Sequence, residues 1–356
     1  MSAIAAQRSP LYASLPTIYN HHDQLWPATP AHFLDHLYNN FDYRADDVWL
    51  SSYPRSGTTW TYAVLYAVLY EGDIAALQHA QQAGKVLAFL PIEVGSAASV
   101  PERLNAWKAL PSPRVIPTHL SYHLYPQTVL ERHCKRIHVT RNPKDVAVSF
   151  YHLHRSHKIL GYYTGTWDEF LACFLEGQVV YGSWFDHTLG WWSSLQESAG
   201  NALMLRYEDM QHDFATHIRR LGAFLGKHLS PHAVSAIAEY GSFASMSVNP
   251  FINRDRDPLM DFSIARFLRK GVMGDWRNHF TAEQNARFQA VWDEKLGGTV
   301  CSSISPCRRP HTPATGATAA RRSQADGVLL VRRRRALGAI TAAEAVTPLG
   351  PSACAT

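Results

Sequence analysis

Cysteine is scarce in this sequence, with five in 356 residues. Cys134 and Cys173 stand alone, and Cys301, Cys307 and Cys354 lie in a C-terminal segment of unusual composition. No pair has the spacing of a zinc site, and no regular pattern indicates a disulfide framework. The scarcity excludes small disulfide-stabilised domains and zinc-finger proteins as classes.

Long apolar runs are also missing. The N-terminal stretch MSAIAAQRSPLYASLP is interrupted by Arg8 and Pro10 before a secretory apolar region could form. No later stretch reaches the uncharged length that a membrane span needs. We therefore expect a cytosolic protein with no membrane partner.

Excess charge is missing from most of the chain. Residues 301–356 hold eight arginines, no lysine and two acidic residues, a net of +6, and the whole chain carries +5, so residues 1–300 carry −1. The main part of the chain therefore gives no reason to expect a nucleic-acid partner. The arginine run 332–335 could bind nucleic acid or a membrane surface, but such runs are usually solvated.

Aromatic residues are absent from residues 301–356, which are rich in Ala, Arg, Pro, Ser and Thr. Such a segment cannot bury enough apolar surface to offset the entropy of ordering it. We predict three parts: an N-terminal segment at 1–30, one main domain at 31–300, and a disordered, low-complexity basic tail at 301–356. A functional basic arm is the alternative for the tail.

The main part has apolar strands that alternate with amphipathic helices. Strands are expected at 46–53, in PRVIPTHL, at 136–140 and in ALMLRYEDM. Helices are expected in TTWTYAVLYAVLYEG, from Pro143 onward, in DFATHIRRLGAFLG and in TAEQNARFQAVWDEKL. The alternation predicts an α/β fold with a central parallel sheet flanked by helices on both faces.

A small polar turn separates the first of these strands from its helix, in WLSSYPRSGTTW. Gly57 allows close approach of a ligand to the backbone, Ser56, Thr58 and Thr59 offer hydroxyls, and the following helix start favours an anion. The stretch is not a Walker A loop, because no lysine follows the glycine. Taken alone, it could equally be an ordinary capped turn.

Two further segments favour the anion-binding interpretation. RNPKDVAVSFYH places Arg141 at a strand end and Ser149 on the next helix, and an arginine fork suits a phosphate. FLRKGVMGDWRNHF sets Arg269 and Lys270 beside Gly271. Three separated anion-friendly segments in one domain suggest a ligand with phosphate groups at both ends.

These motifs resemble the cytosolic sulfotransferases, which use 3′-phosphoadenylyl sulfate (PAPS) as donor. YPRSGTTW resembles the family's 5′-phosphosulfate loop, RNPKDVAVSFYH its 3′-phosphate element, and RKGVMGDWRNHFT its C-terminal signature. YGSWFDHTLGWW, LRYEDM and GSFASMSVNP match family segments in the expected order, so the resemblance covers about residues 30–300. It implies a P-loop-like domain that transfers a sulfonyl group to a hydroxyl or amine of a small acceptor, with no metal.

The resemblance also assigns roles to residues. His119, Arg55 and Ser149 are expected to be catalytic, with His119 as general base. Arg55, Ser56, Gly57, Thr58 and Thr59 are expected to hold the 5′ phosphosulfate, and Trp60 to stack on adenine. Arg141, Ser149, Arg269, Lys270 and Gly271 are expected to hold the 3′-phosphate. The adenine site is expected to be lined by Tyr207, Ser242, Phe243 and Met246, and Phe267 is a further expected cofactor-binding residue.

The implied mechanism depends on charge. The acceptor attacks sulfur in line and 3′,5′-adenosine bisphosphate (PAP) leaves, so cations and backbone donors must stabilise the transferred group. A histidine with an ordinary pKa near ~6.5 can accept the acceptor's proton at neutral pH.

The chain departs from the family pattern at several positions. Arg55 replaces a lysine, which keeps the charge but changes its geometry. Pro117 also replaces a lysine, which removes one expected contact to the phosphosulfate. Gly241 replaces a common Thr, which we expect to weaken a hydrogen bond near adenine. A homodimer is open to question because the usual dimer motif is degraded at Arg277, Thr281, Ala282 and Ala286.

The histidines of YHLHRSHK are a weaker candidate site. A metal needs ligands that converge, and His152 and His154, two residues apart on a helix, do not. We expect these residues and His157 to lie on a helix surface.

Two alternatives to the enzyme remain open: a catalytically silent PAP-binding protein, and a small-molecule kinase. The missing Walker lysine counts against the kinase. The acceptor depends on loop shape, and the sequence does not define it.

Overall fold

The computed structural model describes residues 10–12, 18–21, 24–27, 38–93, 100–196, 200–255 and 257–297, and the structural statements below concern these residues. The predicted tail at 301–356 and most of the predicted segment at 1–30 lie outside them. The boundaries of the predicted parts therefore stay a prediction.

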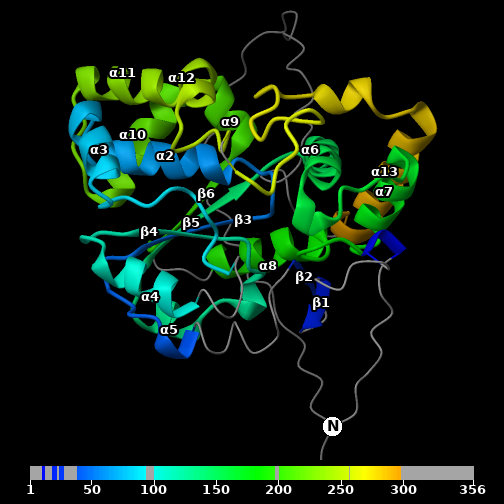
Figure 1. Cartoon of the computed structure of the whole chain (residues 1–356), viewed down its shortest axis with the longest axis horizontal. Coiled ribbons are helices and arrows are strands. Elements are labelled where there is room, and N and C mark those ends of the chain that lie inside the picture. Colours follow the sequence, from blue (N-terminus) through cyan, green and yellow to red (C-terminus); the bar gives the residue numbers. More distant parts are fainter. Residues whose placement is uncertain are drawn as a thin grey trace, which may run out of the picture. The chain divides into compact units, whose positions relative to one another are not determined.

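A four-stranded parallel sheet forms the centre of the fold, in the order β4-β3-β5-β6 (Figure 1). Its strands are β3 (Val48–Ser52), β4 (Val115–Thr118), β5 (Lys135–Thr140) and β6 (Ala202–Arg206). Pairing aligns Val48 with Val115 and with Lys135, and Arg136 with Ala202. A separate antiparallel pair joins β1 (Ile18–His21) to β2 (Gln24–Pro27). The four predicted strands are thereby confirmed.

Helices cover both faces of this sheet, as predicted. In Figure 1, α2, α3, α10 and α11 lie on one side and α4, α5 and α8 on the other. The α-helices are α2 (Thr58–Leu69), α3 (Ile74–Gln82), α4 (Val100–Ala109), α5 (Gln127–Glu131), α6 (Pro143–Ser156), α7 (Trp167–Leu175), α8 (Trp184–Gln196), α9 (Tyr207–His212), α10 (Phe214–Leu225), α11 (Pro231–Tyr240), α12 (Phe243–Val248) and α13 (Ala282–Leu296). Short 3₁₀ turns are η1 (Pro10–Tyr12), η3 (Tyr122–Leu124), η4 (Lys158–Leu160) and η5 (Asp275–Asn278).

Alternation along β3 divides the apolar interior into two cores. Val48 and Leu50 pack with α2, α10 and α11, whereas Trp49 packs with aromatic residues of the opposite face. A strand buried on both faces needs apolar residues at successive positions, which is why DVWL contains no alternation of polar and apolar residues.

Local capping fixes the helix starts that border the site. Asn142 caps α6 by accepting a hydrogen bond from the Lys144 backbone N–H, and Pro143 occupies the first turn. Thr281 and Gln284 form a reciprocal capping box at α13. Within the described ranges, no helix is both long and apolar enough to cross a membrane.

Candidate active site

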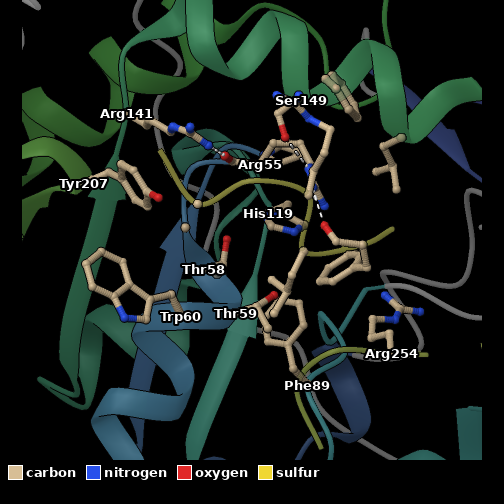
Figure 2. Close-up of a pocket in the computed structure, with 18 of the residues that line it drawn as sticks. Arg55, Thr58, Thr59, Trp60, Phe89, His119, Arg141, Ser149, Tyr207 and Arg254 are labelled. Carbon is tan, nitrogen blue, oxygen red and sulfur yellow. Dashed lines mark hydrogen bonds between the residues drawn. The ribbon is translucent and has the colours of Figure 1, made fainter. Parts of the chain in front are cut away.

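A cavity of about 570 Å³ opens at the carboxyl ends of the parallel strands (Figure 2). This edge is where ligands bind in open α/β sheets, because the turns leaving each strand converge there. Every residue predicted for the site lines the cavity except Ser56 and Ser242. Ser56 is fully buried beneath the turn, and Ser242 caps α12 by accepting from the Ser245 backbone N–H.

The turn between β3 and α2 contains two residues with positive φ, a conformation that residues other than glycine rarely adopt. Arg55 has φ 69°, and Gly57 has φ 102°. A Cβ on Gly57 would lie 2.7 Å from Tyr207 Cδ2, so only glycine fits. Because Gly57 offers no side-chain cap, the first N–H groups of α2 stay available to an anion.

Arg55 joins the predicted segments. Its Nε donates to Ser149 Oγ at 2.9 Å, and its Nη2 donates to the Phe267 carbonyl at 2.8 Å. The pKa of Arg55 is lowered to about 9, first by burial and then by the positive charges of Arg141, Arg269 and Arg254. A bound anion would relieve this repulsion, and the geometry holds the guanidinium ready for one.

Arg141 and Arg269 contribute donors that have no partner within the described part of the chain. Arg141 donates to the Arg55 carbonyl at 3.2 Å and to the Val272 carbonyl at 3.1 Å, and its guanidinium lies 4.3 Å from the Tyr207 ring centre. Among the described residues, the buried Nε atoms of Arg141 and Arg269 have no hydrogen-bond partner. Orphaned buried donors in a cavity fit a ligand with phosphate oxygens.

The C-terminal signature is held in place by two carboxylates. Asp275 accepts from Arg269 at 2.5 Å and from Lys270 at 2.7 Å. Burial would raise the pKa of Asp275, but hydrogen bonds from Lys270, Asn278 and Arg269 outweigh it and hold the pKa well below its usual range. Asp145 accepts from the backbone N–H groups of residues 274 and 276 at 2.7 and 3.0 Å.

The side of the cavity predicted for adenine contains Trp60, Tyr207, Phe243 and Met246. The Trp60 indole meets the Tyr207 ring edge-on at 5.3 Å and donates to the Gly241 carbonyl at 2.8 Å. A Cβ at Gly241 would lie 2.8 Å from the end of the Phe214 ring. Phe214 therefore occupies the space that the Thr common in the family would need at position 241.

His119 is held in one tautomer. Its Nδ1 lies 2.8 Å from the Ser52 carbonyl oxygen, which can only accept, so Nδ1 carries the proton and Nε2 does not. Burial lowers the pKa of His119 to about 4, the hydrogen bond to Ser52 opposes this, and the charge of Arg55 adds to it. The imidazole is therefore neutral at pH 7, with a lone pair on a side chain that lines the cavity.

Glu93 was not predicted from the sequence. Its carboxylate accepts from the His119 backbone N–H at 2.6 Å and from Thr118 Oγ1 at 2.9 Å. Burial raises the pKa of Glu93 to about 7, although the His119 N–H opposes the rise. A lone acid in the apolar run LAFLPIEV was the available signal, because a buried carboxylate needs a polar partner.

Three more residues were missed or misplaced. Arg254 lines the cavity, and nothing in NRDRDP marked it. The expectation of helix-surface histidines was wrong for His154, which is fully buried against Tyr12 Oη at 2.6 Å, and His157 lines the cavity. Among the described residues, no three His, Cys, Asp or Glu side chains are grouped to hold a metal ion.

The departures from the family pattern have structural consequences. Pro117 is buried in β4, an edge strand that among the described residues pairs with β3 alone and so tolerates a residue without an N–H. It does not line the cavity. The degraded dimer motif is exposed at all four positions, namely Arg277, Thr281, Ala282 and Ala286.

The fold and the cavity together define an α/β protein that holds an anionic nucleotide at the ends of its strands. The comparisons narrow this class. The sulfotransferase domain model matches residues 45–300. Human sulfotransferase 1C2 is 37% identical over 275 residues, covering 75% of this chain and 88% of that protein. Bovine sulfotransferase 1A1 is 39% identical over 261 residues, covering 73% and 86% respectively.

Solved structures agree with the sequence comparisons. The crystal structure of mouse sulfotransferase SULT7A1 complexed with PAP has a TM-score of 0.64 at 34% identity, covering 80% of this chain and 95% of that one. Retinol dehydratase, at 24% identity and a TM-score of 0.63, shares the fold. The chain therefore belongs to the sulfotransferase family, and the predicted family and enzyme class are confirmed.

Proposed function

We propose that this sulfotransferase moves a sulfonyl group from PAPS to a hydroxyl or amine of a small acceptor, with His119 as general base. One observation carries the proposal. A neutral histidine with an unprotonated Nε2 shares a cavity with Arg55, which is half-buried, cationic and held by Ser149. A base and an anion-stabilising group are thus positioned around one space.

The residues present fit the donor. The turn at Gly57–Thr59 and Arg55 would hold the 5′ phosphosulfate, and the unpartnered donors of Arg141 and Arg269 would hold the 3′-phosphate. Ser56, although buried away from the cavity surface, has an Oγ with no partner among the described residues. These groups supply the charge and hydrogen bonds that a nucleotide with two anionic ends requires.

In the proposed reaction, His119 accepts a proton and Arg55 stabilises a growing negative charge. His119 Nε2 takes the proton of the acceptor as the acceptor–sulfur bond forms. The sulfur–oxygen bond to the phosphate breaks, and the electron pair stays on the phosphate oxygen of PAP. Arg55, held by Ser149 and Phe267, would stabilise the charge that grows there.

Transfer of labelled sulfonyl from PAPS to a panel of phenols, alcohols and amines tests the proposal directly. We expect labelled product with at least one phenol. PAP binding without transfer to any acceptor would favour the silent nucleotide-binding protein, and magnesium-dependent consumption of ATP would favour the kinase. Calorimetry adds a second arm: PAP should bind far more tightly than AMP, and equal affinities would contradict the 3′-phosphate assignment.

The cytosolic location and the oligomeric state stay predictions. Cell fractionation tests the first, and sedimentation of the purified protein tests the second.

A further inference from the structure

The cavity is lined by a cation that the proposed transfer does not use. Arg254 lines the cavity, its side chain is 24% exposed, and only its Nη2 donates a hydrogen bond among the described residues, to Asp257. A guanidinium has several further donors, so most of its hydrogen-bonding capacity stays available. Arg254 also has φ 55°, a backbone conformation that is costly for a side chain and is concentrated at ligand sites.

Helix α6 lines the cavity along much of its length. Ser149, Phe150, Leu153 and His157 line the cavity from one face of α6 and its C-cap. At about 1.5 Å per residue, the 14 residues of α6 span about 21 Å. Arg141 stands before the first turn, Ser149 holds Arg55 in the middle, and His157 lines the cavity at the C-cap.

The segment carrying Arg254 is attached to that far end. The Lys158 N–H donates to the Leu259 carbonyl at 2.8 Å, and His157 forms an isolated antiparallel bridge with Met260. The charge of Arg254 is felt at His157, whose pKa is lowered to about 4 by burial first and by Arg254 next. In the view of Figure 2, His119 lies between Arg141 and Arg254.

Among the described residues, no carboxylate that lines the cavity neutralises the charge of Arg254. The lining residues include several cations and no Asp or Glu among the described residues. Asp257, the partner of Arg254, does not line the cavity, and His157 is neutral at pH 7 because of its lowered pKa. The Phe267 ring lies between apolar lining and two cations, with its centre 5.1 Å from the Arg254 guanidinium and 4.8 Å from that of Arg55. An apolar surface beside cations that no lining carboxylate neutralises favours an amphipathic anion over a neutral molecule.

We propose that Arg254 selects acceptors that carry an anionic group, such as a carboxylate, in addition to the hydroxyl that reacts at His119. This inference rests on the proposed function, because it takes His119 as the reacting end. Arg254 acts in acceptor recognition and not in the chemical step. A phenol with a carboxylate on a short chain has the required arrangement.

Binding of a matched pair of phenols to the PAP-saturated protein tests this selection without turnover. The pair is 3-(4-hydroxyphenyl)propionate and its amide, which differ in charge and little in size. Calorimetry should show the acid binding at least about tenfold more tightly, a difference of ~1.4 kcal/mol. Arg254→Gln should remove this preference, and Arg254→Lys should keep part of it because the charge remains.

Arg266→Gln is the matched control, since Arg266 is an exposed arginine of the same region that does not line the cavity. It should keep the full preference for the acid. Equal binding of acid and amide by the unmodified protein, no binding of either, or a preference that survives Arg254→Gln would each overturn the proposal. Turnover of the same phenols with PAPS is scored separately. A preference without transfer refutes the proposed function alone, and transfer without a preference refutes the role of Arg254 alone.

Discussion

At the residue scale, burial sets the chemistry of His119. Ser52 holds one ring nitrogen and Glu93 holds the backbone of His119, so the imidazole has little freedom to turn. Its pKa of about 4 lies well below the ordinary value of ~6.5 that the sequence suggested. The residue therefore stays in its base form across the whole neutral range.

His119→Ala should lower kcat by roughly 10²–10⁴ while PAP affinity is retained, because His119 lies outside the three phosphate-binding segments. In the unmodified protein, the low-pH loss of activity that belongs to His119 should appear near its pKa of about 4, since only the neutral ring accepts a proton. Steady-state rates against pH and PAP calorimetry measure both effects.

His123→Ala is the control for this variant, because His123 is exposed and does not line the cavity. It should retain near-normal turnover. A fully active His119→Ala protein would show that the base has been assigned to the wrong side chain.

At the element scale, the turn between β3 and α2 does two things at once. Gly57 in its left-handed conformation starts α2 without a side-chain cap, and Tyr207 from α9 closes over the space where a Cβ would lie. The uncapped helix start faces the cavity, where an anion can replace the missing cap. The same glycine thus connects folding to donor binding.

Gly57→Ala should weaken PAP binding at least tenfold, because the new methyl group would displace Tyr207 from the site. It should also cost about 1–2 kcal/mol of folding stability through its positive φ. Gly84→Ala is a matched control: Gly84 also has a positive φ, of 69°, but nothing lies within 4 Å of an added Cβ. Calorimetry and urea unfolding compare the two. Unchanged PAP affinity in Gly57→Ala would contradict the role given to the turn.

At the scale of the whole molecule, four buried histidines make stability depend on pH. Burial lowers the pKa of His119 to about 4, of His154 and His187 to about 3, and of His138 well below its usual value. Between pH ~6.5 and ~4 the unfolded chain binds protons that the folded chain does not. Folding stability should therefore fall as the pH falls through this window.

Each of these histidines contributes on the order of 1.4 kcal/mol per pH unit inside that window. Glu93 offsets the destabilisation caused by one histidine. Its pKa is raised to about 7, so below that pH the folded chain holds a proton there that the unfolded chain lacks. The midpoint of urea unfolding should be clearly lower at pH 5 than at pH 7. A midpoint that is equal or higher at pH 5 would mean that these side chains are not buried as the structure has them.

Removal of residues 303–356 should leave the fold and sulfonyl transfer largely intact. The family match ends at residue 300, and Leu296 of α13 is a buried core residue 3% exposed. Thermal melting and the labelled-PAPS assay compare the truncated and full chains. A truncated protein that is insoluble or melts many degrees lower would show that the tail packs on the domain.

Local order was accessible from the sequence, because strands, turns and helix caps depend on neighbours in the chain. The apolar residues 48–50, the glycine of the turn and Pro143 after Asn142 each predicted their element correctly. The motifs also predicted which side chains would share one cavity, since parallel strands bring their carboxyl ends to one edge. The sequence therefore determined the fold class, the family and most of the candidate site.

Tertiary structure alone decided how those residues are tuned. Glu93 reaches His119 across 26 positions, and Phe214 takes the space beside Gly241 from a different helix. Arg254 reaches the far end of α6 only because residues 259 and 260 pair with residues 158 and 157. No sequence pattern encodes these contacts, because burial and pKa depend on the sum of many distant neighbours. The lowered pKa of His119 and the position of Ser242 outside the cavity both follow from that packing.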